Sequence, residues 1–290
     1  MNILLLGKTG QVGFELHRLL APLGTLVAPD RKALDLSDEQ AVSAYLADCR
    51  PDLIVNAAAW TAVDAAEEQT EAAMRLNRDL PAQLAAYAAA ASCRLVHYSS
   101  DYVYPGSGDS PRTENSSTGP LNAYGRSKLA GDEAIMSSGA DYLIFRTSWV
   151  YSARGNNFMK TMLRLAKDRP ELNVVADQTG APTPARLIAQ VTALAVYGRL
   201  DSGLYHLAAR GETSWHGFAQ EIFRLARASG VPLAVAPDRV HPIPTRDYPT
   251  PATRPLNSRL DVSKLERALN IRMPDWQPQL VLTLTEYLEK

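Results

Sequence analysis

The amino-acid sequence predicts an α/β fold, in which a doubly wound parallel sheet is followed by a smaller and less regular C-terminal region. Three observations lead to this prediction. Short apolar runs alternate with longer stretches of helical periodicity through the first half of the chain. A glycine cluster directly follows the first apolar run. Prolines accumulate between residues 237 and 255, which excludes a long regular element there.

Each predicted strand is a short, largely apolar run, and the runs cover residues 3–6, 26–27, 53–55, 94–98 and 142–145. The predicted helices between them cover residues 12–20, 37–49, 67–91 and 123–138. Ser37 is the expected N-cap of the second helix, with Gln40 three residues later as in a capping box. The third helix is rich in alanine, the strongest helix former. Regularity fades after Trp149.

The composition is that of an ordinary globular protein. Of the 290 residues, 46% are hydrophobic and 21% are charged, so the chain can bury a core without disulfides. A formal net charge of -1 gives no overall positive field to attract nucleic acid or an anionic membrane. Cys49 and Cys93 form no CxxC motif, and Gly7 ends the first apolar run early. We therefore expect a cytoplasmic protein without a signal peptide or a membrane span.

The glycine cluster GKTGQVG covers residues 7–13, between the first strand and the first helix. Glycines at a helix N-terminus let backbone N–H groups approach a pyrophosphate. A tight turn with close helix packing is the alternative, but the strand–turn–helix context favours a dinucleotide. The cluster does not end in lysine followed by serine or threonine, which disfavours a P-loop. The predicted cofactor contacts in this loop are Gly7, Gly10, Gln11, Val12 and Gly13.

The second strand is followed by Asp30 and Arg31. An acid at this place suits the ribose hydroxyls of NAD, whereas a base suits the extra phosphate of NADP, so the choice between NADH and NADPH stays open. Asp35 and Leu36, at the start of the next loop, are candidates for contact with the adenine. The alternative for Asp35 is an exposed acid that precedes a helix.

Tyr124 and Lys128 are four residues apart on a predicted helix and therefore project from the same face. A phenol with a pKa near ~10 is a poor acid-base catalyst at neutral pH, but an adjacent ammonium favours its ionised form. The pair suits the reduction of a carbonyl group. The alternative is an aromatic ring that covers a lysine stem, and the glycine loop upstream favours catalysis.

The motifs divide the chain near residue 150. Residues 1–150 are expected to form a Rossmann-type NAD(P)-binding domain. Residues 151–290 are expected to form mainly a substrate-binding domain, from which part of the chain can cross back to the first.

The motifs, in this order, resemble those of the extended short-chain dehydrogenase/reductase family. Within it, the sequence is most similar to the branch that reduces the C4 keto group of dTDP-4-dehydro-β-L-rhamnose to give dTDP-L-rhamnose. The segments that carry the similarity are NAAAWTAVD at 56–64, SSDYVY at 99–104, RTSWVY at 146–151, NF at 157–158, DQTGAPT at 177–183 and RPLNS at 254–258.

The resemblance implies a role for each matching residue. Tyr124 would donate the proton, Lys128 would hold the nicotinamide ribose, and Ser100, where the family more often has threonine, would hydrogen-bond the reacting oxygen. NADPH or NADH would be the cofactor. The residues implied to line its groove are Ala58, Ala59, Trp60 and Thr61. Those implied to contact the nucleotide sugar are Ser100, Asp101, Trp149, Asn157, Arg254 and Asn257. For Asp101 the alternative is a turn cap, and for Trp149 it is a core position.

Two other classes of function share these motifs. A nucleotide-sugar epimerase or dehydratase has the same cofactor loop and Tyr/Lys pair. However, the dehydratases have Glu after the Asp, whereas Tyr102 follows Asp101 here. A non-catalytic regulatory subunit could bind NADP as a structural ligand. Retention of both Tyr124 and Lys128 favours catalysis.

Some members of the branch form dimers in which glutamates hold Mg²⁺. Glu15 matches one of these glutamates, but Arg186 stands at the second position, and Glu286 or Glu289 would be the third. We therefore expect no metal site, an ion pair between Arg186 and Glu15, and a monomer or weak homodimer. The histidines at 97, 206 and 216 show no ligand spacing and are expected to be structural or surface groups.

Overall fold

In the computed structural model, which describes residues 1–289, a six-stranded parallel sheet has the order β2-β1-β3-β4-β5-β10. Its strands are β1 (Asn2–Leu6), β2 (Thr25–Val27), β3 (Leu53–Asn56), β4 (Arg94–Ser100), β5 (Asp141–Thr147) and β10 (Gly203–His206). Leu4 of β1 lies opposite Val27 on one side and Ile54 on the other. The order therefore reverses between β1 and β3, and open α/β sheets bind ligands at such a point. The predicted parallel sheet is confirmed.

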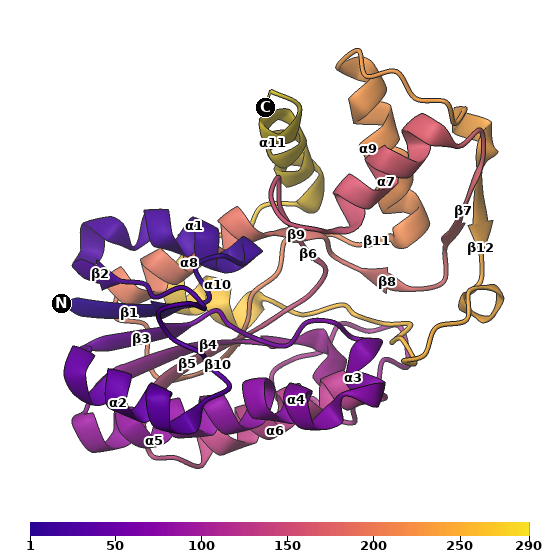
Figure 1. The fold of residues 1–290 in the computed structure, drawn as a ribbon. Helices are drawn as coiled ribbons and strands as arrows, with labels where there is room; N and C mark the ends of the chain where they lie inside the picture. The colour runs from indigo at the N-terminus through magenta and orange to yellow at the C-terminus, as the bar shows by residue number, and fades with distance from the viewer. Residues whose placement is uncertain (290) are drawn as a thin grey trace.

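Helices cover both faces of the sheet (Figure 1). Leu16 of α1 (Gln11–Leu19) and Leu187 of α8 (Ala185–Tyr197) pack with the side chains that point to one face, among them Leu5. The opposite face, with Leu4, packs against Leu46 of α2 (Glu39–Cys49) and against α5 (Leu80–Ala91). Alternation along β1 thus places successive leucines in two separate cores.

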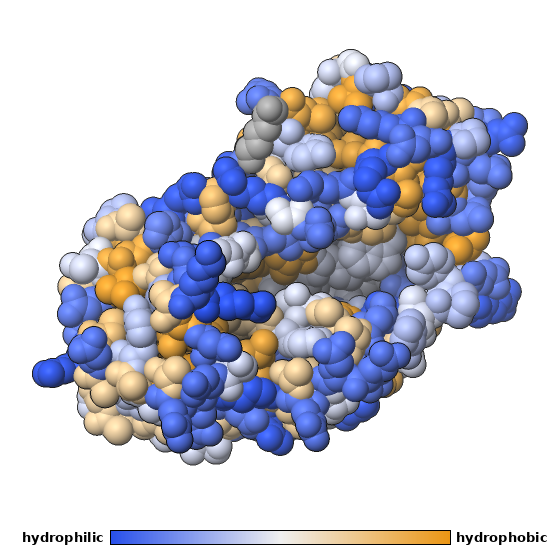
Figure 2. Space-filling view, in the orientation of Figure 1, coloured by the Kyte–Doolittle hydropathy of each residue, from blue (hydrophilic) through white to orange (hydrophobic). Residues whose placement is uncertain are grey.

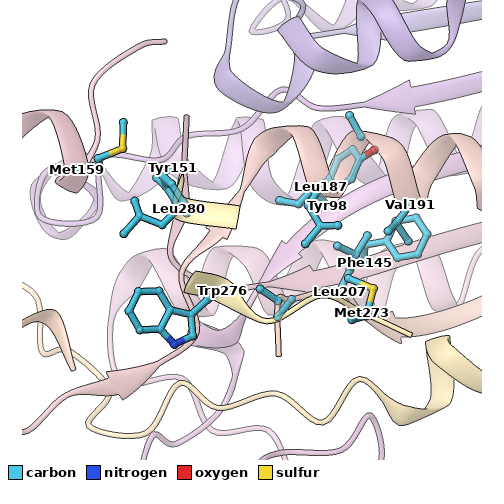
Figure 3. Close-up of a cluster of buried hydrophobic side chains, with 14 of the residues drawn as sticks. Tyr98, Phe145, Tyr151, Met159, Leu187, Val191, Leu207, Met273, Trp276 and Leu280 are labelled. Carbon is cyan, nitrogen blue, oxygen red and sulfur yellow. The ribbon is translucent and has the colours of Figure 1, made fainter. Parts of the chain in front are cut away.

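The core beneath α8 joins the two halves of the chain. Figure 3 shows Tyr98 of β4 and Phe145 of β5 beside Leu187 and Val191 of α8. The Tyr98 hydroxyl also lies 2.8 Å from the hydroxyl of Thr192. Residues from beyond position 150 therefore complete the core of the sheet.

The predicted capping box at Ser37 is wrong. The second helix, α2, begins at Glu39, and the carboxylate of Asp38 caps it by accepting from the N–H of Ala41 at 3.0 Å. The Ser37 hydroxyl instead donates to Asp35 at 2.7 Å. Both residues are good caps, and the one beside the helix makes the bond.

The predicted helix over 67–91 is interrupted. It consists of α3 (Ala65–Glu68), α4 (Thr70–Met74), a π-helical turn (Arg75–Asp79) and α5. Pro81 lies in the first turn of α5 and has no N–H to donate to the carbonyl of Asn77. Such π-helical turns frequently mark functional sites.

Much of the C-terminal half forms a second lobe beside the sheet and its covering helices (Figure 1). Its helices are α7 (Phe158–Asp168), α9 (Trp215–Ala228) and α11 (Trp276–Leu288), while α10 (Ser263–Leu269) lies near β10. Short strands pair as β6 (Val150–Tyr151) with β9 (Thr183–Pro184), β7 (Leu172–Val175) with β12 (Val240–Ile243), and β8 (Thr179–Gly180) with β11 (Thr213–Ser214).

This half contains more helix than the sequence pattern indicated. The side chains of Asn157 and Ser214 cap α7 and α9 and stabilise their first turns. The proline-rich segment holds only β12 and two 3₁₀ turns, Pro237–Arg239 and Thr245–Asp247. None of the helices within residues 1–289 is long and apolar enough to cross a membrane.

Candidate active site

A cleft of about 960 Å³ lies at the carboxyl ends of β1 to β5, where the strand order reverses. Figure 2 shows the molecule hollowed between the part that contains the sheet and the C-terminal lobe. The cleft brings together most of the predicted site residues, namely Gly7, Gly10, Gln11, Val12, Asp30, Arg31, Asp35, Leu36, Ala58, Ala59, Trp60, Thr61, Ser100, Asp101, Tyr124, Lys128 and Trp149.

The glycine loop lets the backbone line part of the cleft. Gly7 has a φ of +83°, and a Cβ there would lie 2.7 Å from the backbone of Ala57. A Cβ on Gly13 would lie 2.0 Å from the carbonyl oxygen of Gly7, so Gly13 allows close packing of α1. Among residues 1–289, no side chain caps the first turn of α1, which follows Gly10. Its backbone N–H groups fit the pyrophosphate of a dinucleotide.

Two acids after β2 are engaged with their own turns. Oδ1 of Asp30 accepts from two backbone N–H groups, each at 3.0 Å, while the neighbouring Arg31 is exposed. Oδ1 of Asp35, beside Leu36, accepts from the hydroxyl and the N–H of Ser37, and these bonds lower the pKa of Asp35. The guanidinium of Arg31 is exposed at the same end of the cleft and, among the described residues, forms no ion pair that ties it to these turns.

The wall formed by residues 58–61 is fixed by an amide that the sequence pattern did not reveal. Asn77, fully buried in the π-helical turn, accepts from the N–H of Trp60 at 2.9 Å and donates to its carbonyl at 3.0 Å. The same amide donates to the hydroxyl of Ser127 at 3.0 Å, which ties the wall to α6 (Ala123–Met136). Pro81, four residues after Asn77, is the one sequence signal for this turn.

Tyr124 and Ser100 meet at the centre of the cleft. Tyr124 lies one turn before Lys128 on α6, and Asn122 caps that helix by accepting from the N–H of Gly125 at 2.7 Å. Burial raises the pKa of Tyr124 to about 12, although a hydrogen bond with Ser100 acts in the opposite direction. The phenol is therefore protonated at neutral pH.

Lys128 is buried to the end of its side chain, with only 1% of the residue exposed. Its Nζ donates to the carbonyl oxygen of Tyr98 at 2.6 Å and lies 3.2 Å from Nε2 of His97. Burial lowers the pKa of Lys128 to about 8, and Asp132 acts against this shift. The lysine is held by strand β4 while it faces the cleft.

A buried ion pair supports α6 beneath the site. Asp132 accepts from Nε of Arg146 at 2.9 Å and from the hydroxyl of Ser99 at 2.9 Å. Arg146 also donates to the hydroxyl of Tyr104 at 2.8 Å, which lies 2.6 Å from His206. His206 is thus structural, as expected from its lack of ligand spacing.

Asp101 is a buried acid beside the Ser100 hydroxyl in the cleft. It accepts from Ser100 Oγ at 3.1 Å. Burial raises the pKa of Asp101 to about 6, against the hydrogen bonds with Ser258 and Ser100. The carboxyl group can therefore exchange a proton near neutral pH.

Trp149 forms a wall of the cleft together with Trp215, which the sequence reasoning missed. The two rings are stacked, and Phe158 lies against Trp215 with ring centroids 4.6 Å apart. Trp215 follows Ser214, the N-cap of α9. That serine before an amphipathic stretch was a signal for the helix, but nothing in the sequence indicated that its first residue faces the cleft.

The remaining predicted substrate contacts lie outside the lining of the cleft. Asn157 caps α7 and donates to Gln11 Oε1 at 2.9 Å. Arg254 pairs with Asp64 at 2.7 Å. Asn257 is buried, and its amide donates to the carbonyl of Ser110 at 2.9 Å. Each of these side chains has a partner within the protein, although Nη1 of Arg254 is buried without a hydrogen bond to any residue that the structure describes.

The residues around Glu15 do not fit a magnesium site. Arg186 places Nε 3.3 Å from Glu15 and a terminal nitrogen 2.6 Å from Glu286. The expected pairing of Arg186 with Glu15 is confirmed. A guanidinium between two carboxylates already supplies the positive charge and repels a cation.

Comparison with known proteins agrees with this geometry. The profile of the RmlD substrate binding domain family matches residues 1–289. The dTDP-4-dehydrorhamnose reductase of Escherichia coli strain K12 is 49% identical over 99% of this chain and 98% of its own length. That of Burkholderia thailandensis is 47% identical over 100% of both chains.

Solved structures of proteins with the same description have the same fold. That from Clostridium acetobutylicum superposes with a TM-score of 0.92 at 35% identity and covers 100% of both chains. That from Bacillus anthracis, in complex with NADP, superposes with a TM-score of 0.90 at 33% identity and covers 98% of both chains.

Proposed function

The chain belongs to the RmlD substrate binding domain family, and on this premise we propose that it reduces the C4 keto group of dTDP-4-dehydro-β-L-rhamnose to give dTDP-L-rhamnose. NADPH or NADH is the proposed cofactor. The observation that carries the proposal is the Tyr124–Ser100 pair beside the buried Lys128, in a cleft that the glycine loop also lines.

The chemistry requires a hydride at C4 and a proton at its oxygen. The bound nicotinamide supplies the hydride. Tyr124 donates its phenolic proton to the oxygen as negative charge develops there, and the Ser100 hydroxyl turns from Asp101 to donate a hydrogen bond to the same atom. Lys128, when charged, stabilises the tyrosinate that remains. Ser100 and Lys128 are buried and Tyr124 is partly buried, which limits the access of water and strengthens each of these interactions.

The ring of Tyr102 argues against a dehydratase. It packs edge-on against Tyr124, with ring centroids 5.5 Å apart and planes 79° apart. The Glu that the dehydratases have at this position would bring a carboxylate, whereas here an aromatic ring occupies the place. A base for the removal of water is therefore missing at this position.

We assign the cofactor mainly to residues 1–150 and the sugar mainly to residues 151–290. Trp149 and Trp215 line the cleft beyond β5, which β3 and β4 separate from β1 and its glycine loop, and this supports the division. Helix α8 and strand β10 of the second half nevertheless pack on or join the sheet. We also propose that the chain acts in the cytoplasm as a monomer or weak homodimer. The free thiols of Cys49 and Cys93 support the compartment.

The test is net oxidation of reduced nicotinamide with authentic dTDP-4-dehydro-β-L-rhamnose. We expect one cofactor to be oxidised for each sugar reduced. dTDP-glucose, which has no keto group, is the matched control and should give no oxidation. An epimerase would recycle its cofactor and a regulatory subunit would leave it unchanged, so the absence of net oxidation would refute the proposal.

A further inference from the structure

His97 lies directly behind Lys128, on strand β4, and only 1% of it is exposed. Both ring nitrogens have a neighbour. Nδ1 lies 3.2 Å from the amide nitrogen of Asn56, and Nε2 lies 3.2 Å from Nζ of Lys128. Burial and the charge of Lys128 hold the pKa of His97 well below its usual range, so the ring is neutral. A neutral imidazole carries one proton, on one of these two nitrogens.

The hydrogen bonds of the Asn56 side chain determine which nitrogen of His97 carries the proton. Asn56 accepts from the N–H of Ala58 through Oδ1, at 3.2 Å. With its oxygen turned to that donor, the side chain presents its NH₂ group to His97. Nδ1 must then accept, and the proton of the imidazole is on Nε2.

This proton points at Lys128. An ammonium has three donors and no acceptor, so an N–H group aimed at it is unfavourable. A neutral amine has a lone pair that accepts from Nε2–H, and it can still donate to the carbonyl of Tyr98 at 2.6 Å. The hydrogen bonds therefore run in one direction, from Ala58 through Asn56 and His97 to Lys128.

Other charged groups near Lys128 must be weighed against this chain. On α6, Asp132 favours the ammonium, but its carboxylate already accepts from Arg146 of β5 and from Ser99 of β4. Tyr124, also on α6, is neutral because burial raises its pKa to about 12. Burial of Lys128 lowers its pKa and so favours the neutral amine, as the N–H group of His97 does.

We propose that His97 is a positioning residue for Lys128, which presents Nε2–H to Nζ and thereby favours the neutral amine while the cleft is empty. This proposal rests on the proposed function only for the role of Lys128 in catalysis. It implies that His97 sets the alkaline limit of kcat/KM, since this ratio reports the protonation states of the free enzyme.

The direct test is the tautomer of His97 in the ligand-free protein. Long-range proton–nitrogen NMR correlations of protein labelled with ¹⁵N-histidine distinguish the two forms, and the signals missing from His97→Gln identify the ring. We expect a protonated Nε2 and an unprotonated Nδ1 above pH 8, where Lys128 is neutral. A protonated Nδ1, or a ring protonated on both nitrogens, would overturn the proposal, and this result does not depend on any activity.

Two variants test the consequence for catalysis. In Asn56→Asp the carboxylate accepts from Nδ1–H, which moves the imidazole proton and lets Nε2 accept from an ammonium. In His97→Gln the amide can turn its oxygen toward Lys128. Both should move the alkaline limit of kcat/KM upward by about one pH unit or more, a gain of about 10-fold at the alkaline end.

The matched control is His216→Gln. His216 lies on α9, and its Nε2 is 3.0 Å from the carbonyl oxygen of Val240. The pH profile of this variant should equal that of the unmodified protein. If the profiles of Asn56→Asp and His97→Gln also equal it, the positioning role is wrong. If net cofactor oxidation is absent in the unmodified protein while Nε2 carries the proton, the proposed function fails and the tautomer assignment stands.

Discussion

The indole of Trp149 lies face to face with that of Trp215, with ring centroids 3.6 Å apart and planes 8° apart. Trp149 has a φ of +49°, which is uncommon for a bulky residue. A Cβ on Gly180 would lie 2.8 Å from the Trp149 ring, so the ring fits closely between Gly180 and its stacked partner. The first residue of α9 thus fixes a wall of the cleft.

Trp215→Leu should raise the KM for the sugar nucleotide by roughly 3- to 10-fold, because an aromatic pair contributes about 0.5–1.5 kcal/mol beyond its buried area. The kcat should change less, since the proton donor is not touched. Steady-state kinetics at saturating NADPH measure both constants. Leu194→Ala, at an exposed position on α8, is the control and should leave the KM unchanged. An unchanged KM in Trp215→Leu would contradict the role of this wall.

Tyr124→Phe should lower kcat by ~10² to 10⁴, the usual contribution of general acid catalysis, with little change in the affinity for NADPH. The ring stays in place, so the packing against Tyr102 is kept. Tyr87→Phe removes a hydroxyl on α5, outside the cleft, and serves as the control. Turnover and cofactor titration are measured on both variants. Near-normal turnover of Tyr124→Phe would mean that another group is the acid.

Arg31→Ala should raise the KM for NADPH by roughly 10- to 100-fold and leave that for NADH nearly unchanged. A hydrogen bond to a charged group contributes about 1.5–3 kcal/mol, and only NADPH carries the phosphate that Arg31 can bind. Lys32→Ala, the next residue, is the control. Parallel assays with the two cofactors provide the measurement, and an equal effect on both would refute this contact.

The stability of the free protein should depend on pH through Lys128. Its pKa is about 8 in the folded state and 10.5 in its ordinary state, so between these values the unfolded chain binds more protons. Stability therefore rises with pH across this window, by up to about 3 kcal/mol, and the cost is fully present below pH 8. Urea unfolding of the wild type and of Lys128→Met at several pH values isolates this term. A constant difference between the two proteins from pH 7.5 to 10.5 would contradict it.

Activity and sedimentation should be insensitive to EDTA, because Arg186 takes the place of a cation between Glu15 and Glu286. Arg186→Ala should lower the free energy of unfolding by about 1–2 kcal/mol, since Glu15 is buried and would lose this partner. Arg199→Ala, after the end of the same helix, is the comparison. A dimer that dissociates in EDTA, with loss of activity, would refute this prediction.

The strands and the catalytic pair could be predicted from the sequence because their signals are local. Apolar runs define the strands, and the spacing of Tyr124 and Lys128 places them on one face of α6. Tyr124 and Lys128 line the same cleft as the glycine loop, as the order of the motifs indicated.

The polar residues of the second half were harder to interpret. Asn157 and Asn257 carry amides that suit a ligand equally well as a helix cap or a loop, and the structure uses them within the protein. Trp215 and Asn77 reach the site through long-range packing and through an irregular turn. Periodicity contains no information about either.

The last strand of the central sheet comes late in the chain. A nascent polypeptide that has been synthesised only to residue 150 contains β5 but not β10, whose residues 203–206 pair with residues 143–146. Until that segment is synthesised, β5 presents an unpaired edge beside fully apolar side chains such as Phe145. Such an edge readily adds a strand from another chain. The interval between the folding of β5 and the arrival of β10 is therefore a period in which the nascent chain exposes an edge that can aggregate.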